Sequence, residues 1–167
     1  SVTLFNTHVD KAITWESENP NEWHDGRYNQ LGTKTQGQGI DLKLDVSLGG
    51  DSKVGLSYNS TVDEKGKNVP NIPSHVVNLT VLSKMTDKIA ISGDLKVVRD
   101  LNGVHSDGSG SVKLKDYNLL NGKITYQISD NNQVFLSAEN LLDENYETSS
   151  GYSTASRAFY VGYKTEF

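Results

Sequence analysis

The sequence predicts an all-β protein, a transmembrane antiparallel up-and-down β-barrel, and three observations support this prediction. Apolar side chains recur at every second position in about eight stretches, each long enough to cross a bilayer as a tilted strand of roughly 9 to 11 residues. The links between the stretches alternate between short turns and longer polar loops. The last stretch ends on the aromatic residues Phe159, Tyr163 and Phe167, where a soluble domain usually has a frayed polar tail.

The composition narrows the class of protein. Hydrophobic residues make up 35% and charged residues 22% of the 167 residues, and the mean hydropathy is −0.53, as in an ordinary single domain. A barrel is compatible with these values because its strands alternate apolar and polar side chains, whereas no run approaches the roughly 18 apolar residues of a membrane-spanning helix. The net charge of −5 and the scattered basic residues disfavour nucleic acid as a partner. Cysteine is absent, which excludes disulfides and thiolate metal sites.

The first three expected strands differ in clarity. The first runs from Val2 to Trp15 with Lys11 on its expected apolar side, which is formed by Phe5, Thr7, Val9, Ile13 and Trp15. The second alternates most regularly, with apolar side chains at Ile40, Leu42, Leu44, Val46 and Leu48. Polar side chains stand between them, at Asp41, Lys43, Asp45 and Ser47. The third strand is marked by Val54, Leu56 and Tyr58. We therefore expect one face of these strands to meet lipid and the other to line a wet lumen.

The remaining five expected strands repeat this alternation. The fourth is marked by Val77, Leu79 and Val81, and the fifth by Ile89, Ile91, Gly93, Leu95 and Val97. The sixth carries Leu120, Ile124, Tyr126 and Ile128. The seventh carries Val134, Leu136 and Ala138, and the terminal strand carries Phe159, Val161, Tyr163, Thr165 and Phe167. Helical periodicity is nowhere sustained.

The connections between these strands alternate in length. Tight turns rich in Gly, Asp, Ser and Asn are expected at 49–52, 86–87 and 129–132. Longer polar links are expected at 17–27, 63–74, 102–110 and 148–156. Strands that run up and down place alternate connections at opposite ends, so one rim has short turns and the other long loops.

Three stretches carry a more specific signal. The strongest is AENLLDENYE at 138–147, followed by Gly151-Tyr152, by Arg157 and by a closing strand that ends in Phe167. Two weaker ones are YNQLG at 28–32 with QGQGIDL at 36–42, and NIPSH at 71–75. In this order and spacing they resemble the C-terminal part of the β-barrel of a TonB-dependent outer-membrane receptor. Asp41, where that family more often has Glu, and Thr165, where an aromatic residue is common, depart from the pattern.

The resemblance implies a location and a function. Such a receptor has a 22-stranded barrel and an N-terminal plug domain, so residues 1–167 are expected to form a single, partial barrel domain without the plug. Because the chain starts at Ser1 without a leader, any signal peptide is expected to have been removed or to lie outside the given sequence. The implied function is outer-membrane import of a bulky nutrient of the siderophore, haem or cobalamin class, with no enzyme activity and no cofactor. The implied partners are outer-membrane lipid, the rest of the barrel and its plug, the barrel-assembly machinery, and TonB acting through the plug.

Two sets of residues are singled out. The resemblance assigns folding or assembly roles to Asn140, Leu141, Asp143, Tyr146, Arg157, Phe159, Tyr163 and Phe167. Short polar side chains such as Asn140 and Asp143 suit backbone hydrogen bonds at a strand end, and terminal aromatic rings suit the headgroup region. The expected outer loops supply candidate ligand contacts at Trp23, His24, Asp25, Arg27, His105 and Tyr152. No metal site is expected, because the four histidines show no compact ligand spacing.

The inward charged residues and the overall architecture each leave alternatives open. Pairing or hydration in the lumen, or a substrate path, fits Asp41, Lys43, Asp45, Asp94, Lys96, Lys164 and Glu166. The chain is also the size of a complete eight-stranded outer-membrane barrel with an anchoring, adhesion or structural role. A soluble lipocalin-like barrel or β-sandwich would instead turn the apolar face inward, and alternation by itself does not distinguish these orientations.

Overall fold

The computed structural model describes the backbone of residues 1–9, 13–17, 26–30, 35–105 and 110–166, and the side chains of residues 1–9, 37–105 and 110–166. These residues form strands, turns and irregular segments. None of them lies in a helix that is long and apolar enough to cross a membrane.

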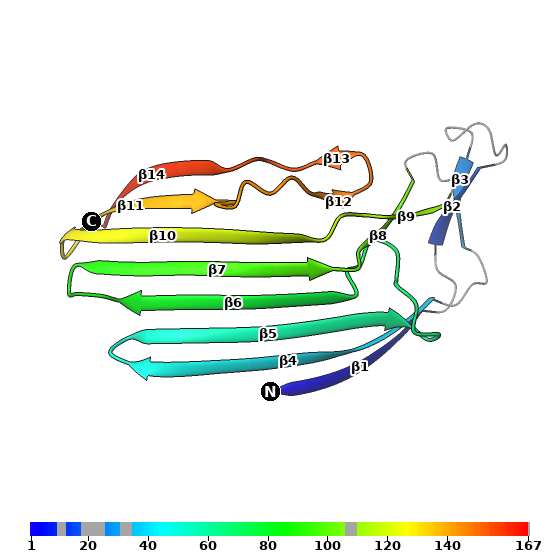
Figure 1. Cartoon of the computed structure of the whole chain (residues 1–167), viewed down its shortest axis with the longest axis horizontal. Coiled ribbons are helices and arrows are strands. Elements are labelled where there is room, and N and C mark those ends of the chain that lie inside the picture. The colour runs from blue at the N-terminus through cyan, green and yellow to red at the C-terminus, as the bar shows by residue number, and fades with distance from the viewer. Residues whose placement is uncertain (10–12, 18–25, 31–34, 106–109, 167) are drawn as a thin grey trace.

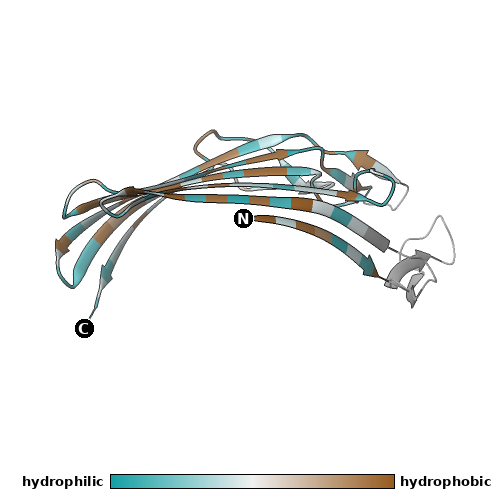
Figure 2. Ribbon diagram, turned by 90° about the horizontal axis from the view of Figure 1, so that it is seen from below, coloured by the Kyte–Doolittle hydropathy of each residue, from teal (hydrophilic) through white to brown (hydrophobic). Residues whose placement is uncertain are grey.

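Eight strands form one antiparallel sheet in which chain neighbours lie side by side, in the order β1-β4-β5-β6-β7-β10-β11-β14 (Figure 1). Their bounds are β1 Val2–Val9, β4 Thr35–Gly49, β5 Ser52–Asp63, β6 His75–Lys84, β7 Ile89–Arg99, β10 Tyr117–Ser129, β11 Asn132–Glu139 and β14 Ala158–Thr165. Figure 2 shows this sheet as a single curved and twisted layer. The eight up-and-down strands predicted from the sequence are thus confirmed, with one change in the first of them, described below.

Three two-stranded hairpins extend the loop ends of this sheet (Figure 1). They are β2 Ile13–Ser17 with β3 Gly26–Gln30, β8 Asn102–Val104 with β9 Ser111–Lys113, and β12 Glu147–Ser149 with β13 Tyr152–Ser153. The turns at the other end are short. Between β4 and β5, for example, Gly49, Gly50 and Asp51 all have positive φ, which Gly and Asp tolerate. The predicted alternation of short turns and long loops is therefore present.

The register separates the two faces of the sheet. One row across five neighbouring strands is purely apolar and consists of Leu44, Leu56, Leu79, Leu95 and Leu120. The adjacent row points to the opposite side and consists of Asp45, Gly55, Thr80, Asp94 and Asn121. We call these sides the apolar face and the polar face.

The apolar face is open to its surroundings. Leu44 is 58% exposed and Val161 is 82% exposed, whereas the buried hydrophobic residues among those described are Val98, Leu101, Leu114 and Tyr117. A soluble barrel or sandwich would gather its apolar face into a dry core, so this arrangement contradicts the soluble alternative. Phe167 itself lies outside the described residues.

The first strand corrects the sequence prediction. Val2 lies opposite Leu42 and Leu4 opposite Ile40, so these residues belong to the apolar face. Phe5, Thr7 and Val9 lie on the polar face instead. Phe5 fits there because its partner Gly39 has no side chain: a Cβ on Gly39 would come within 2.5 Å of the Phe5 ring. The strand also ends at Val9, and Ile13 and Trp15 belong to β2.

The two edges of the sheet do not meet. The described pairs join β1 to β4 and β14 to β11, and these outer strands lie at opposite edges (Figure 1). A complete eight-stranded barrel requires pairing between the first and last strands. The described strands therefore form an open, curved wall, contrary to the alternative of a complete small barrel.

Candidate functional site

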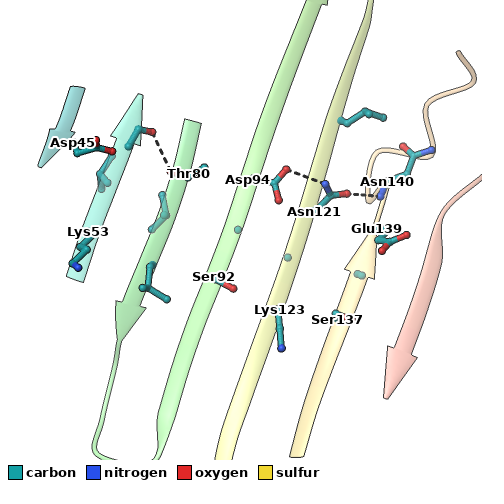
Figure 3. A pocket seen from close by; sticks show the side chains of 18 of the residues that line it. Asp45, Lys53, Thr80, Ser92, Asp94, Asn121, Lys123, Ser137, Glu139 and Asn140 are labelled. Carbon is teal, nitrogen blue, oxygen red and sulfur yellow. Dashed lines mark hydrogen bonds between the residues drawn. The ribbon is translucent and has the colours of Figure 1, made fainter. Parts of the chain in front are cut away.

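The polar face carries a hollow of about 1020 Å³ lined by β4 to β7, β10, β11 and the segment that follows β11. Acidic and basic side chains alternate around it. Figure 3 shows charged groups from five strands, namely Asp45, Lys53, Asp94, Lys123 and Glu139. Opposite charges spread over a wide hollow suit hydration and contact with a polar partner, and they leave no compact catalytic group. Within the described residues, no group of His, Asp and Glu is arranged to hold a metal ion.

A chain of hydrogen bonds links the sheet to the loop after β11 (Figure 3). The Asn121 Nδ2 donates to Asp94 Oδ2 at 2.9 Å, and the Asn140 backbone N–H donates to Asn121 Oδ1 at 3.0 Å. Only apolar residues mark the sixth strand expected from the sequence, and Asn121 and Lys123 are not among them. Their spacing of two residues is the signal that places both on the polar face with Asp94.

Asn140 organises the loop between β11 and β12. Its side chain donates from Nδ2 to the carbonyls of Glu144 at 2.9 Å and Ala155 at 3.3 Å, and its Oδ1 accepts from the Glu144 N–H at 2.9 Å. Asn140 is 6% exposed and has a φ of +49°, a conformation that Asn tolerates better than most residues. Its polar atoms thus bind the backbone, as expected for a residue at a strand end.

Asp143 and Arg157 close the same loop against β14. The Asp143 Oδ1 accepts from the Arg157 N–H at 3.0 Å, and its Oδ2 lies 3.3 Å from the Arg157 guanidinium. Arg157 also donates to the Leu141 carbonyl at 3.4 Å. These contacts bring Asn140, Leu141, Asp143 and Arg157 together in one loop, which we call the loop joint. Phe159 and Tyr163 lie apart from it, exposed on the apolar face.

A small core holds the loop-end hairpins on the polar side of the sheet. Tyr117 packs with the buried Val98, Leu101 and Leu114, and its ring centroid lies 4.3 Å from that of Tyr146. Lys115 lies 2.7 Å from Glu144, and Lys113 lies 2.9 Å from Asp100. The Lys113 ammonium lowers the pKa of the Asp100 carboxyl through their hydrogen bond and charge, and Asp100 raises the pKa of Lys113 in the same way. The hairpins are therefore tied to the sheet.

The structure brings two of the six candidate ligand residues into neighbouring hairpins. His105 follows β8 and is exposed, and Tyr152 starts β13 and is 70% exposed. The hairpins touch, since a Cβ added to Gly103 would lie 3.5 Å from the Ser150 Cβ. Arg27 lies in β3. Trp23, His24 and Asp25 lie outside the described residues.

Comparison with known proteins agrees with this architecture. Residues 1–141 match the family model "TonB dependent receptor-like, beta-barrel". A curated relative, the vitamin B12 transporter BtuB of Vibrio cholerae, is 22% identical over 98% of this chain and 26% of its own length. The ferripyoverdine receptor FpvA of Pseudomonas aeruginosa aligns with a TM-score of 0.74 at 19% identity, covering 99% of this chain and 24% of FpvA. The siderophore receptor PiuA of Acinetobacter baumannii gives 0.75 at 15% identity, with 98% and 25% covered.

These matches bear on the sequence predictions. The chain spans about a quarter of the length of the relatives it matches. They are transporters and receptors rather than enzymes. The predicted β-barrel fold, the family resemblance and the outer-membrane location are confirmed. The family implies a plug domain and interaction with TonB, and one solved structure shows FpvAI in complex with pyocin S2.

Proposed function

This chain belongs to the TonB-dependent receptor β-barrel family, and we propose that it supplies eight neighbouring wall strands to an importer of a bulky nutrient. The nutrient belongs to the siderophore, haem or cobalamin class, in keeping with relatives named for siderophores and vitamin B12. The strands come from the C-terminal part of the barrel, and residues 1–167 form one partial barrel domain.

The separation of the two faces carries this proposal. The leucine row is directed to lipid, and the row of Asp45, Thr80, Asp94 and Asn121 is directed to the lumen. The hollow on the polar face is wide and carries both charges, which suits a water-filled passage next to a plug. The energy for transport comes from TonB acting through that plug.

The loop joint and the terminal strand serve assembly. Asn140, Leu141, Asp143, Tyr146 and Arg157 fix the last long loop between β11 and β14 through the contacts described above. Phe159 and Tyr163 of β14, together with Phe167 at the end of the sequence, form the aromatic signal that is read by the barrel-assembly machinery. The exposed aromatic rings of Phe159 and Tyr163 suit the lipid interface.

The loop hairpins provide the outer contacts for the nutrient. His105 and Tyr152 are exposed on adjoining hairpins held by the small core around Tyr117. An imidazole and a phenol offer hydrogen bonds and an aromatic surface to a chelate or macrocycle. Trp23, His24, Asp25 and Arg27 are proposed as further contacts from the first long loop.

An uptake assay tests the function. The full native polypeptide that contains this sequence is expressed in cells that lack their own outer-membrane importers, with and without TonB. Accumulation of labelled ferric siderophores, haem and cobalamin is then measured. We expect TonB-dependent accumulation of one class, and at least about threefold weaker accumulation at subsaturating nutrient after His105→Ala or Tyr152→Ala. Lys65→Ala, in the exposed loop after β5, is the matched control. A folded barrel that accumulates none of the three classes in a TonB-dependent manner would contradict the proposal.

A further inference from the structure

The apolar face has one exception to its neutrality. Among the described residues paired in the eight-stranded sheet, Arg99 is the single side chain of that face that is charged at neutral pH. It lies at the end of β7, opposite His75 at the start of β6. Ionisable residues directed to lipid are costly and are usually functional, so this position requires an explanation.

Arg99 is held in place by its neighbours. One guanidinium nitrogen, Nη1, donates to the carbonyls of Val98 at 2.8 Å and Tyr117 at 3.1 Å, and Nη2 donates to Asn118 Oδ1 at 2.8 Å. A guanidinium has five N–H donors. These bonds use three, so within the described part of the chain the Nε–H and one Nη2–H remain available. The preferred partners of such a pair are the oxygens of a carboxylate or a phosphate.

His75 adds a second group to the same spot. The Tyr58 Oη lies 2.9 Å from His75 Nδ1, and the two rings stack with centroids 6.0 Å apart. Because a phenol donates readily to a neutral imidazole, we assign Tyr58 as the donor, which leaves the proton of His75 on Nε2. The nearby Asp100 carboxylate is paired with Lys113. We call Arg99, His75, Tyr58 and Asn118 the Arg99 cluster.

The cluster lies at the depth of lipid headgroups. The ten residue steps from Ile89 to Arg99 cover about 33 Å along β7 at about 3.3 Å each. For a strand tilted by about 40° this is roughly 25 Å in height, which equals the apolar band of an outer-membrane barrel. The cluster is at the long-loop end of the sheet (Figure 1), so it borders the outer leaflet. Val77 and Val97, two residues nearer the short turns, continue the apolar face below it.

We propose that the Arg99 cluster binds the phosphate of an anionic lipid of the outer leaflet, whose acyl chains lie along the apolar face. A fixed guanidinium and an imidazole N–H complement a phosphate in charge and in donors. A lipid is favoured over a free anion because the donors lie at the loop end of the apolar face, whose leucine row ranges from half-buried at Leu95 to 58% exposed at Leu44. This role is independent of which nutrient the barrel carries.

Native mass spectrometry of the full polypeptide, delipidated in detergent, tests this site. The probes are lipid A with both phosphates, lipid A without phosphates, and inorganic phosphate. The variants are Arg99→Gln, Arg99→Lys and His75→Gln, with Lys88→Gln at the exposed short-turn end as the charge-matched control. Heat-modifiable gel migration shows which variants are folded. His75→Gln leaves every hydrogen bond of Arg99 in place and keeps the test valid if Arg99→Gln does not fold.

We expect the phosphorylated lipid to bind at least about tenfold more tightly than the phosphate-free lipid. Arg99→Gln should remove most of this difference, His75→Gln should weaken phosphorylated-lipid binding about threefold or more, and Arg99→Lys should keep part of it. Lys88→Gln should bind like the unchanged protein. Equal binding of the two lipids would overturn the proposal, as would unchanged binding by a folded His75→Gln variant. Displacement of the lipid by equimolar inorganic phosphate would show a free-anion site instead.

Discussion

Replacing Asn140 by alanine measures how much the Asn140 side chain stabilises the closed form of the loop joint. The change removes three side-chain hydrogen bonds of a buried amide, two to carbonyls and one from the Glu144 N–H. At about 1 kcal/mol each they contribute about 3 kcal/mol. Alanine is also placed at a φ of +49°, which costs about 1 kcal/mol more. The expected loss is about 4 kcal/mol in the free energy of opening this loop, or roughly 500- to 1000-fold.

Hydrogen exchange at single amides is the appropriate assay, because the loop can open while the sheet stays folded. The Leu141 N–H donates to the Leu120 carbonyl, and the Arg157 N–H donates to Asp143 Oδ1. Both acceptors remain in the variant, so faster exchange at these amides reports opening of the whole joint. Asn140→Gly removes the same hydrogen bonds without the cost of a positive φ. In this variant the Leu141 and Arg157 amides should therefore exchange about fivefold more slowly than in Asn140→Ala.

Asn145→Ala, an exposed residue of the same loop, is the control and should leave exchange unchanged. If Leu141 and Arg157 exchange at the same rates in the unchanged protein and in Asn140→Ala, then Asn140 does not hold the joint and its assembly role is wrong. A uniform acceleration across β10 and β11 would mean that the sheet itself depends on this amide.

Three other changes test separate parts of the structure. Gly162→Ala puts a Cβ 2.2 Å from the Phe135 ring and should lower the free energy of unfolding in urea by about 1–3 kcal/mol, a loss that Phe135→Ala should largely relieve. Leu136→Lys on the apolar face should lower the free energy of unfolding in lipid vesicles by about 2–4 kcal/mol. The adjacent Ser137→Lys on the polar face should lower it little, and equal losses for the two variants would refute the assignment of faces. Lys113→Met should raise the pKa of Asp100 towards its usual range in an NMR titration, because Lys113 holds it down. The pairing is complete above the usual carboxylate range and is lost as the pH falls through the lowered pKa of Asp100.

Alternation predicted the faces of most strands because large aliphatic residues fill every second position. Over residues 40–48 of β4 every apolar side chain is followed by a polar one, so only one register is possible there when one face meets lipid. The sequence predicts only long polar links where the hairpins of the long loops lie, because the short strands β8, β9, β12 and β13 contain too few residues to alternate. The Asn140 joint was expected from its motif, but its partners Asn121 and Asp94 are 19 or more residues away and depend on strand register.

The misread first strand shows what the residue types alone do not decide. Both alternating sets of β1 contain apolar residues, and the set with Phe5 looks the more apolar. On the polar face, however, the Phe5 ring lies over Gly39 of β4, and at the other side of the sheet the Phe135 ring lies over Gly162 of β14. In both pairs the ring fills the space left by the missing side chain of the glycine directly opposite. The backbone of that glycine covers one face of the ring, so the aromatic residue is partly shielded from water on the polar face. A Phe opposite a Gly is therefore a signal for the lumen, and it is readable only once the register between two strands is known.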